Sequence, residues 1–67
     1  MKLKNHIKQH RARMNYTQKD LAELTGVSRQ TINTVEKGRF IPSTLLALKI
    51  AEALEMKVDD LFEIIKE

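Results

Sequence analysis

Residues 17–38 read TQKDLAELTGVSRQTINTVEKG and contain two short helical patterns on either side of a single glycine, Gly26. Each pattern starts at a residue whose side chain can cap a helix N-terminus, Thr17 in the first and Ser28 in the second. Asp20 stands where a capping box places an acid, although Glu is the usual residue there. Gly26 suits the left-handed conformation that ends many helices. Two capped helix starts around one glycine predict a helix-turn-helix.

The length and composition of the chain limit what it can do. We expect one domain over residues 1–67, with the helix-turn-helix motif at about 17–36. A fold of this size buries only about 60% of its unfolded surface, which leaves no room for a two-lobed enzyme cleft. The absence of cysteine excludes disulfides, cysteine-ligated zinc and thiol catalysis. No window approaches the roughly 18 apolar residues of a membrane span, so we expect no membrane contact. We expect a cytoplasmic, nucleoid-associated protein, and the absence of cysteine fits a reducing cytoplasm.

Charge is unevenly distributed along the sequence. Residues 1–41 hold nine Lys or Arg and three Asp or Glu, a balance of +6. Residues 42–67 hold three and six, a balance of −3, and the two halves sum to the net +3 of the chain. The basic half favours a polyanionic partner, although charge alone is explained equally simply by an ordinary solvated surface.

The rest of the sequence predicts an all-α fold, a compact bundle of five helices, because it has few β-branched runs, one Pro and two Gly. We expect the first helix over about 4–14, the fourth from Pro42 and Ser43, and the fifth from Val58 or Asp59. Two apolar sets in the fourth helix compete for the core: Leu45, Leu48, Ala51 and Leu54, or Leu46, Ile50 and Ala53. The C-terminal FEIIKE leaves two predictions open, a continued helix or a short strand that pairs with its two-fold mate.

The third predicted helix has an apolar side and a polar side. Ile32, Val35 and Glu36 cluster on the side expected to face the core. The opposite side is rich in hydrogen-bonding groups and almost free of acid, and its residues are Gln30, Asn33, Thr34 and Lys37, with Arg29 at the N-terminal tip. A Gln amide can pair with N6 and N7 of adenine, and an Arg fork matches O6 and N7 of guanine. We therefore expect base reading in the major groove by Arg29, Gln30, Asn33 and Thr34; a merely hydrated helix face is the alternative.

Phosphate contacts are predicted at both ends of the motif. The first N–H groups of the second helix, near Thr17 and Gln18, form a partial positive charge suited to a backbone phosphate, and Lys19 adds charge nearby. Lys37 and Arg39 follow the third helix, where the chain can reach the flanking DNA strand.

With these residues, the sequence closely resembles the Cro/cI repressor-like, or XRE-type, helix-turn-helix family of transcriptional regulators. The resemblance covers about residues 7–62 and is carried by TQKDLAELTGVSRQTINTVEKG, the following RFIPS and LALKIAEALEMKVDDLF. It implies a fold of the lambda-repressor-like DNA-binding type, in which Gln18 contacts phosphate or supports the reading residues. It also implies a salt bridge between Arg11 of the first helix and Glu36 of the third.

The sequence departs from the family pattern in three places. Glu55 stands where many members have Gly after the fourth helix, and Lys57 where a Ser or Thr cap is common. His10 occupies a position that is usually Leu. The first two departures concern the turn between the fourth and fifth helices and leave the expected binding face unchanged.

No other motif indicates catalysis or a bound ligand. His6 and His10 have the spacing of two zinc ligands on a helix, but no third ligand is evident, so we expect no metal. The pair Asp59 and Asp60 is best explained by the positive end of the fifth helix. We expect no enzyme activity, no cofactor and no small-molecule ligand.

Together these features predict a sequence-specific regulator that binds double-stranded DNA, a repressor that recognises a two-fold operator as a homodimer. One alternative is an antitoxin that also represses its own operon, and its mark would be a neutralised toxin. Another is a protein-interaction module that keeps the fold without affinity for DNA. The acid-free side of the third helix argues against that module, because such a surface attracts phosphate.

Overall fold

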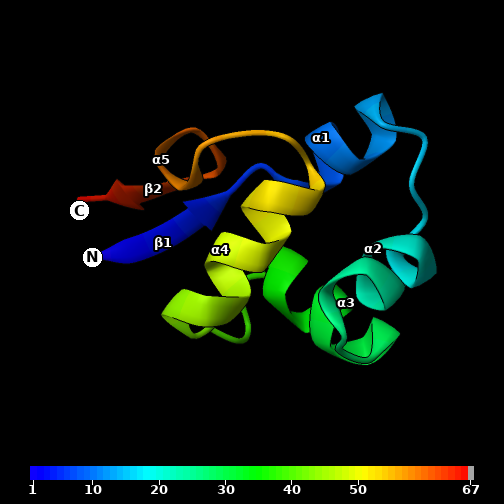
Figure 1. Ribbon diagram of the computed structural model, residues 1–67. Helices are drawn as coiled ribbons and strands as arrows, with labels where there is room; N and C mark the ends of the chain where they lie inside the picture. Colours follow the sequence, from blue (N-terminus) through cyan, green and yellow to red (C-terminus); the bar gives the residue numbers. More distant parts are fainter. Residues whose placement is uncertain (67) are drawn as a thin grey trace.

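The structure, a computed structural model, describes residues 1–66 and places five helices and two strands around one hydrophobic core (Figure 1). In chain order these elements are β1 (Lys2–Asn5), α1 (Ile7–Arg13), α2 (Gln18–Thr25), α3 (Arg29–Glu36), α4 (Thr44–Ala53), α5 (Val58–Leu61) and β2 (Phe62–Ile65). The five predicted helices are present, but the two strands correct the all-α prediction. Within residues 1–66, no helix is both long and apolar enough to cross a membrane.

β1 and β2 form a small antiparallel sheet that joins the two ends of the chain. Lys2 pairs with Ile65 and Asn5 with Phe62, and Figure 1 shows the start of β1 beside the end of β2. The prediction that the first helix begins near residue 4 is therefore wrong, because the preceding residues are extended. The C-terminal tail is a strand, as one of its two predictions had it, but within this chain its partner is β1.

Asn5 connects this sheet to the helices. Its Oδ1 accepts a hydrogen bond from the N–H of Ile7 at 3.2 Å, at the start of α1. Its Nδ2 donates to the carbonyl oxygens of Val35 at 3.0 Å and Glu36 at 3.4 Å, in the last turn of α3. The last carbonyls of a helix lack partners within the helix, so Asn5 stabilises the end of α3 and holds it against β1.

α2 and α3 form the predicted helix-turn-helix with the predicted caps. The Oγ1 of Thr17 accepts from the N–H of Asp20 at 3.0 Å, and the N–H of Thr17 donates to Oδ2 of Asp20 at 2.9 Å, which completes a capping box. Gly26 ends α2 in the left-handed region, with φ of 74°. The Oγ of Ser28 accepts from the N–H of Thr31 at 3.1 Å and begins α3.

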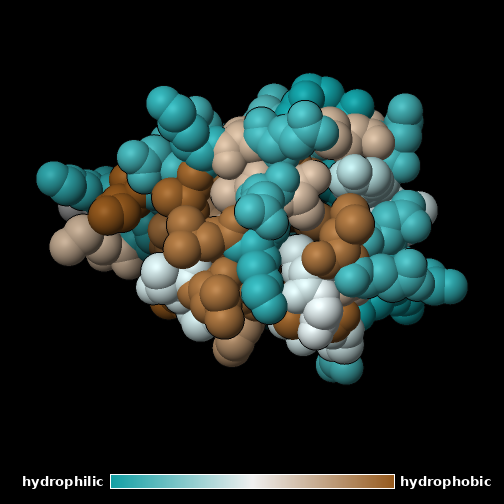
Figure 2. All heavy atoms as spheres, in the orientation of Figure 1, coloured by the Kyte–Doolittle hydropathy of each residue, from teal (hydrophilic) through white to brown (hydrophobic). Residues whose placement is uncertain are grey.

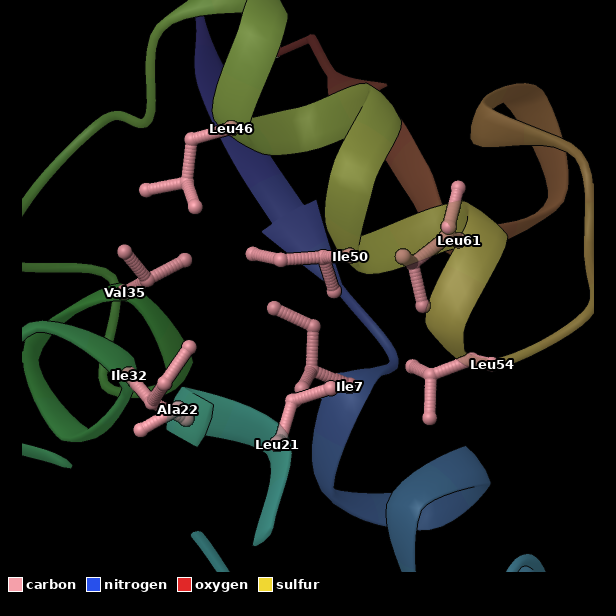
Figure 3. Packing of buried hydrophobic residues seen from close by; sticks show 10 residues of the cluster. Ile7, Leu21, Ala22, Ile32, Val35, Leu46, Ile50, Leu54 and Leu61 are labelled. Atoms are coloured by element: carbon pink, nitrogen blue, oxygen red, sulfur yellow. The ribbon is translucent and has the colours of Figure 1, made fainter. Parts of the chain in front are cut away.

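The core lies where α4 faces α1, α2 and α3. Figure 3 shows side chains from these helices pointing toward one another, with Ile7 of α1 between Ile50 of α4 and Leu21 of α2. The buried apolar residues are Ile7, Leu21, Ala22, Ile32, Val35, Leu46, Ile50, Ala51, Leu54 and Leu61. The core thus takes α4 residues from both of the competing apolar sets, while Leu45 and Leu48 stay largely exposed.

Candidate nucleic-acid interface

The inner side of α3 carries the only acid of that helix, Glu36, and Arg11 of α1 neutralises it. The Nε of Arg11 donates to Oε2 of Glu36 at 2.8 Å, and Nη2 donates to Oε1 at 3.2 Å. The two side chains are 14% and 6% exposed, so the pair is largely removed from water. The Nη1 of Arg11 also donates to the carbonyl of Tyr16 at 3.0 Å. This pair is the one that the family resemblance implies, and it leaves the outer face of α3 free of negative charge.

A relay of hydrogen bonds runs from this ion pair to the outer face of α3. The Nε2 of Gln18 donates to Oε1 of Glu36 at 3.2 Å, and the Nδ2 of Asn33 donates to Oε1 of Gln18 at 3.3 Å. Asn33 is thereby held in one orientation, with its Oδ1 and one N–H left for a base edge. Both Nε2 and Oε1 of Gln18 are hydrogen-bonded, so in this structure Gln18 positions Asn33. One N–H of Gln18 remains for a phosphate.

Gln30 and Thr34 lie one turn apart on the same face. The side chain of Gln30 is exposed, and its amide is suited to the paired donor and acceptor of adenine. The Oγ1 of Thr34 donates back to the helix, to the carbonyls of Gln30 at 3.0 Å and Thr31 at 2.9 Å. Because the hydroxyl proton is used inside the helix, Thr34 offers its methyl group and an acceptor oxygen, a combination that suits a thymine methyl better than a phosphate.

Arg29 lies beside the start of α2. A shallow hollow is lined by Thr17, Gln18, Lys19 and Arg29, and also by Arg11. The N–H of Asp20 is bound to Thr17, so Gln18 and Lys19 supply the first-turn N–H groups that an anion can use. The structure therefore brings the tip of α3 and the positive end of α2 together around one candidate phosphate position.

Asp20 places a negative charge at the same helix end. The backbone N–H of Thr17, and then its side chain, hold the pKa of the Asp20 carboxyl below its ordinary value of 3.8. The carboxylate is therefore ionised at neutral pH, and it stabilises α2 while offsetting part of the positive potential there.

A second hollow lies on the other flank of α3, and two residues of the loop that follows α3 line it. Gln30 and Thr34 line it together with Arg39 and Phe40. Arg39 thus lies next to Gln30 and Thr34. Phe40 is half exposed at 50%. The sequence analysis did not single out Phe40.

Lys37, a predicted phosphate contact, lies beside β1. It lines a separate hollow together with Lys2 and Lys4 of β1, and it lines neither of the hollows beside Arg29 and Gln30. Glu36 also lines this hollow, and Lys4 is paired with Glu63 at 3.9 Å.

Two capped helices joined by a short turn at Gly26, here α2 and α3, form the helix-turn-helix motif of DNA-binding proteins. The helix-turn-helix family model matches residues 7–61, and the chain belongs to this family of Cro/cI-type transcriptional regulators. Bacillus subtilis has a relative, the uncharacterized HTH-type transcriptional regulator YgzD, that is 52% identical over 60 residues, 90% of this chain and 91% of the relative.

Two further similarities bear on the fold and on regulation. The cryptic phage CTXphi transcriptional repressor RstR of Vibrio cholerae is 34% identical over 61 residues, which are 91% of this chain and 54% of RstR. The crystal structure of the restriction-modification controller protein C.AhdI from Aeromonas hydrophila superposes with a TM-score of 0.76 at 30% identity. That superposition covers 81% of this chain and 82% of C.AhdI.

Proposed function

We propose that this protein is a transcriptional repressor that binds a two-fold DNA operator as a homodimer, with α3 in the major groove. The observation that carries the proposal is the charge arrangement of α3, whose one acid is turned inward to Arg11 while its outer face offers amide and cationic groups. The name of the relative RstR, a transcriptional repressor, supports the direction of regulation. Repression follows if the bound protein occupies a promoter.

The contacts divide into base reading and positioning on the backbone. The proposed base-reading residues are Arg29, Gln30, Asn33 and Thr34. The proposed phosphate contacts are Thr17, Gln18, Lys19, Lys37 and Arg39. Arg29 shares a hollow with the start of α2, so we expect its loss to lower affinity as well as sequence preference.

A pair of charge reversals tests the location of the interface. Arg29→Glu and Lys66→Glu change the net charge equally at exposed side chains, one at the tip of α3 and the other after β2. Glu at the start of α3 is compatible with the helix dipole, so we expect Arg29→Glu to fold. Fluorescence anisotropy with a labelled duplex pool should show at least a tenfold loss for Arg29→Glu, of the order expected for one lost charged contact, and little change for Lys66→Glu.

Unfolding midpoints from circular dichroism establish that both variants are folded before their affinities are compared. Equal losses in both variants would mean that the attraction depends on net charge alone and would remove α3 from the interface. Loss in Lys66→Glu alone would place DNA at the strand end of the molecule.

A further inference from the structure

The relay from Glu36 through Gln18 to Asn33 has a direction. The Nε2 of Gln18 donates to Oε1 of Glu36 at 3.2 Å, and the Nδ2 of Asn33 donates to Oε1 of Gln18 at 3.3 Å. Each amide thus turns its NH2 group toward the Glu36 end of the relay and its oxygen toward the other end. The relay crosses the start of α2, on a side of the molecule where Figure 2 shows mainly hydrophilic side chains.

The charge of Glu36 accounts for this direction. Arg11 donates to both oxygens of Glu36, at 2.8 Å and 3.2 Å, and a carboxylate facing a guanidinium accepts hydrogen bonds but has no proton to donate. Gln18 must therefore present its NH2 group to Glu36, because its own oxygen would face another acceptor. The oxygen of Gln18 is then left for Asn33, which must in turn present an NH2 group. An amide turned the other way leaves two acceptors or two donors face to face.

The groups that Asn33 offers to DNA follow from the same direction. Gln18 uses one N–H of Nδ2, so Oδ1 and the second N–H remain. An acceptor beside a donor matches N6 and N7 of adenine in the major groove. Guanine presents two acceptors there, N7 and O6, and matches an Asn33 whose NH2 group is turned outward. The direction of the relay thus distinguishes the two purines.

We infer that Glu36 determines base specificity without touching DNA, because its charge turns the amide of Asn33 so that Asn33 selects adenine over guanine. The inference rests on the base reading by Asn33 in the proposed function, and it names the base. The Glu36 side chain is 6% exposed on the inner side of α3, so it reaches no base itself. Glu36 is a positioning residue, and its effect passes through Gln18.

Glu36→Gln removes the charge and keeps the shape of the side chain. The bond from Nε of Arg11, at 2.8 Å, is the shorter of the two and holds the oxygen of the new amide in place, so the new NH2 group faces Gln18. Gln18 then has to accept a hydrogen bond, and both amides of the relay turn around. We expect Asn33 to present its NH2 group to the base and the preference to move from adenine toward guanine.

Selection of the full chain on random duplex DNA, followed by sequencing, measures this preference at every position of the site. Asn33→Ala identifies the position that Asn33 reads, because preference is relaxed there. At that position wild type should favour adenine, and Glu36→Gln should lower the ratio of adenine to guanine by about tenfold or more, as expected for one bidentate contact. In the Asn33→Ala background, Glu36→Gln should change the ratio no further.

Two further variants separate the direction of the relay from stability. Gln18→Met interrupts the relay but leaves the Arg11–Glu36 pair in place, so we expect it to fold and to lower the same ratio by freeing the amide of Asn33. Ile50→Val is the matched control, because it removes a methyl group from the core and no hydrogen bond of the relay. It should lower the unfolding midpoint in circular dichroism and leave the ratio unchanged. If Glu36→Gln does not fold, Gln18→Met decides alone.

The outcomes separate this inference from the proposed function. An unchanged ratio in Gln18→Met or in folded Glu36→Gln overturns the inference and leaves sequence-specific DNA binding standing. A wild-type preference for guanine at the position relaxed by Asn33→Ala does the same, and so does an Asn33→Ala variant that relaxes no position. A wild-type chain that enriches no motif overturns the proposed function, and this inference with it.

Discussion

Replacing Arg11 by Ala should destabilise the protein more than any surface substitution. The change removes the partner of Glu36, whose side chain is only 6% exposed, and leaves its carboxylate in a place with little water. It also removes the bond from Arg11 to the carbonyl of Tyr16. The donor from Gln18 is the remaining side-chain partner of that carboxylate.

The size of the effect follows from this geometry. Breaking a buried ion pair by removing one partner costs about 3–5 kcal/mol. Because Gln18 still donates to Glu36, we expect the lower end, about 3 kcal/mol. Domains of this length have a total stability of about 3–10 kcal/mol, and 1 kcal/mol shifts their midpoint by about 4–8 °C. The unfolding midpoint of Arg11→Ala should therefore fall by about 12–24 °C.

Thermal and urea unfolding followed by circular dichroism measure this loss. The control is Lys4→Ala, which breaks the Lys4–Glu63 pair, where the atoms are 3.9 Å apart and the side chains 57% and 48% exposed. Such an exposed pair contributes at most about 1 kcal/mol. A double change, Arg11→Met with Glu36→Leu, should recover most of the stability because no unpaired charge remains. If Arg11→Ala loses no more stability than Lys4→Ala, the reasoning about the buried pair is wrong.

Four further substitutions test the reading face, the phosphate contacts and two helix ends. Gln30→Ala should cost about 1–3 kcal/mol at the cognate site and relax preference at one base pair; full discrimination by the variant would remove Gln30 from the reading face. Lys37→Ala should weaken binding to all sequences alike and lower the slope of log affinity against log salt by about one; an unchanged slope would show that Lys37 touches no phosphate. Glu55 ends α4 with φ of 56°, a conformation that costs a non-glycine residue about 1–2 kcal/mol. Glu55→Gly should therefore raise the stability by about 0.5–1 kcal/mol despite the greater freedom of glycine in the unfolded chain, and a lower midpoint would contradict this. The pKa of Asp20 is lowered on folding, so its contribution to stability is complete above its ordinary pKa of 3.8 and is lost as the pH falls through the lower folded value. The stability difference between wild type and Asp20→Asn should accordingly shrink below pH 3.8, whereas a difference independent of pH would exclude an ionised cap.

Local chemistry made the helix-turn-helix predictable. Thr17, Ser28 and Gly26 act on backbone groups within a few residues of themselves, so the caps and the left-handed turn could be inferred from sequence neighbours alone. The two sides of α3 followed from the helical period, which places Ile32 and Val35 in the core.

The features that were not predicted, or were left open as the C-terminal strand was, depend on contacts between distant parts of the chain. β1 and β2 pair the two ends, and each strand alone is a short segment with no pattern that distinguishes it from a helix end. The bonds from Asn5 to the end of α3 arise from the same pairing. In α4, apolar residues on several sides of the helix made the helical period ambiguous, and only packing separates buried Leu46 from exposed Leu45.

The candidate DNA interface also has one part that could be predicted from the sequence and one that could not. The residue types on α3 were predictable because they belong to one helix. The relay from Glu36 through Gln18 to Asn33, and the placement of Lys37 beside β1, depend on how α1, α2 and β1 meet α3. Neither arrangement follows from spacing within a single element.

The most direct test of sequence-specific DNA binding by a dimer is selection on random duplex DNA. The purified protein is mixed with the duplexes at near-physiological salt, and the retained DNA is sequenced. We expect enrichment of a two-fold motif whose half-sites are centred about 10 base pairs apart, one turn of the double helix. No enriched motif, together with no salt-sensitive retention of any duplex, would contradict it and would assign the exposed face of α3 to a partner other than DNA.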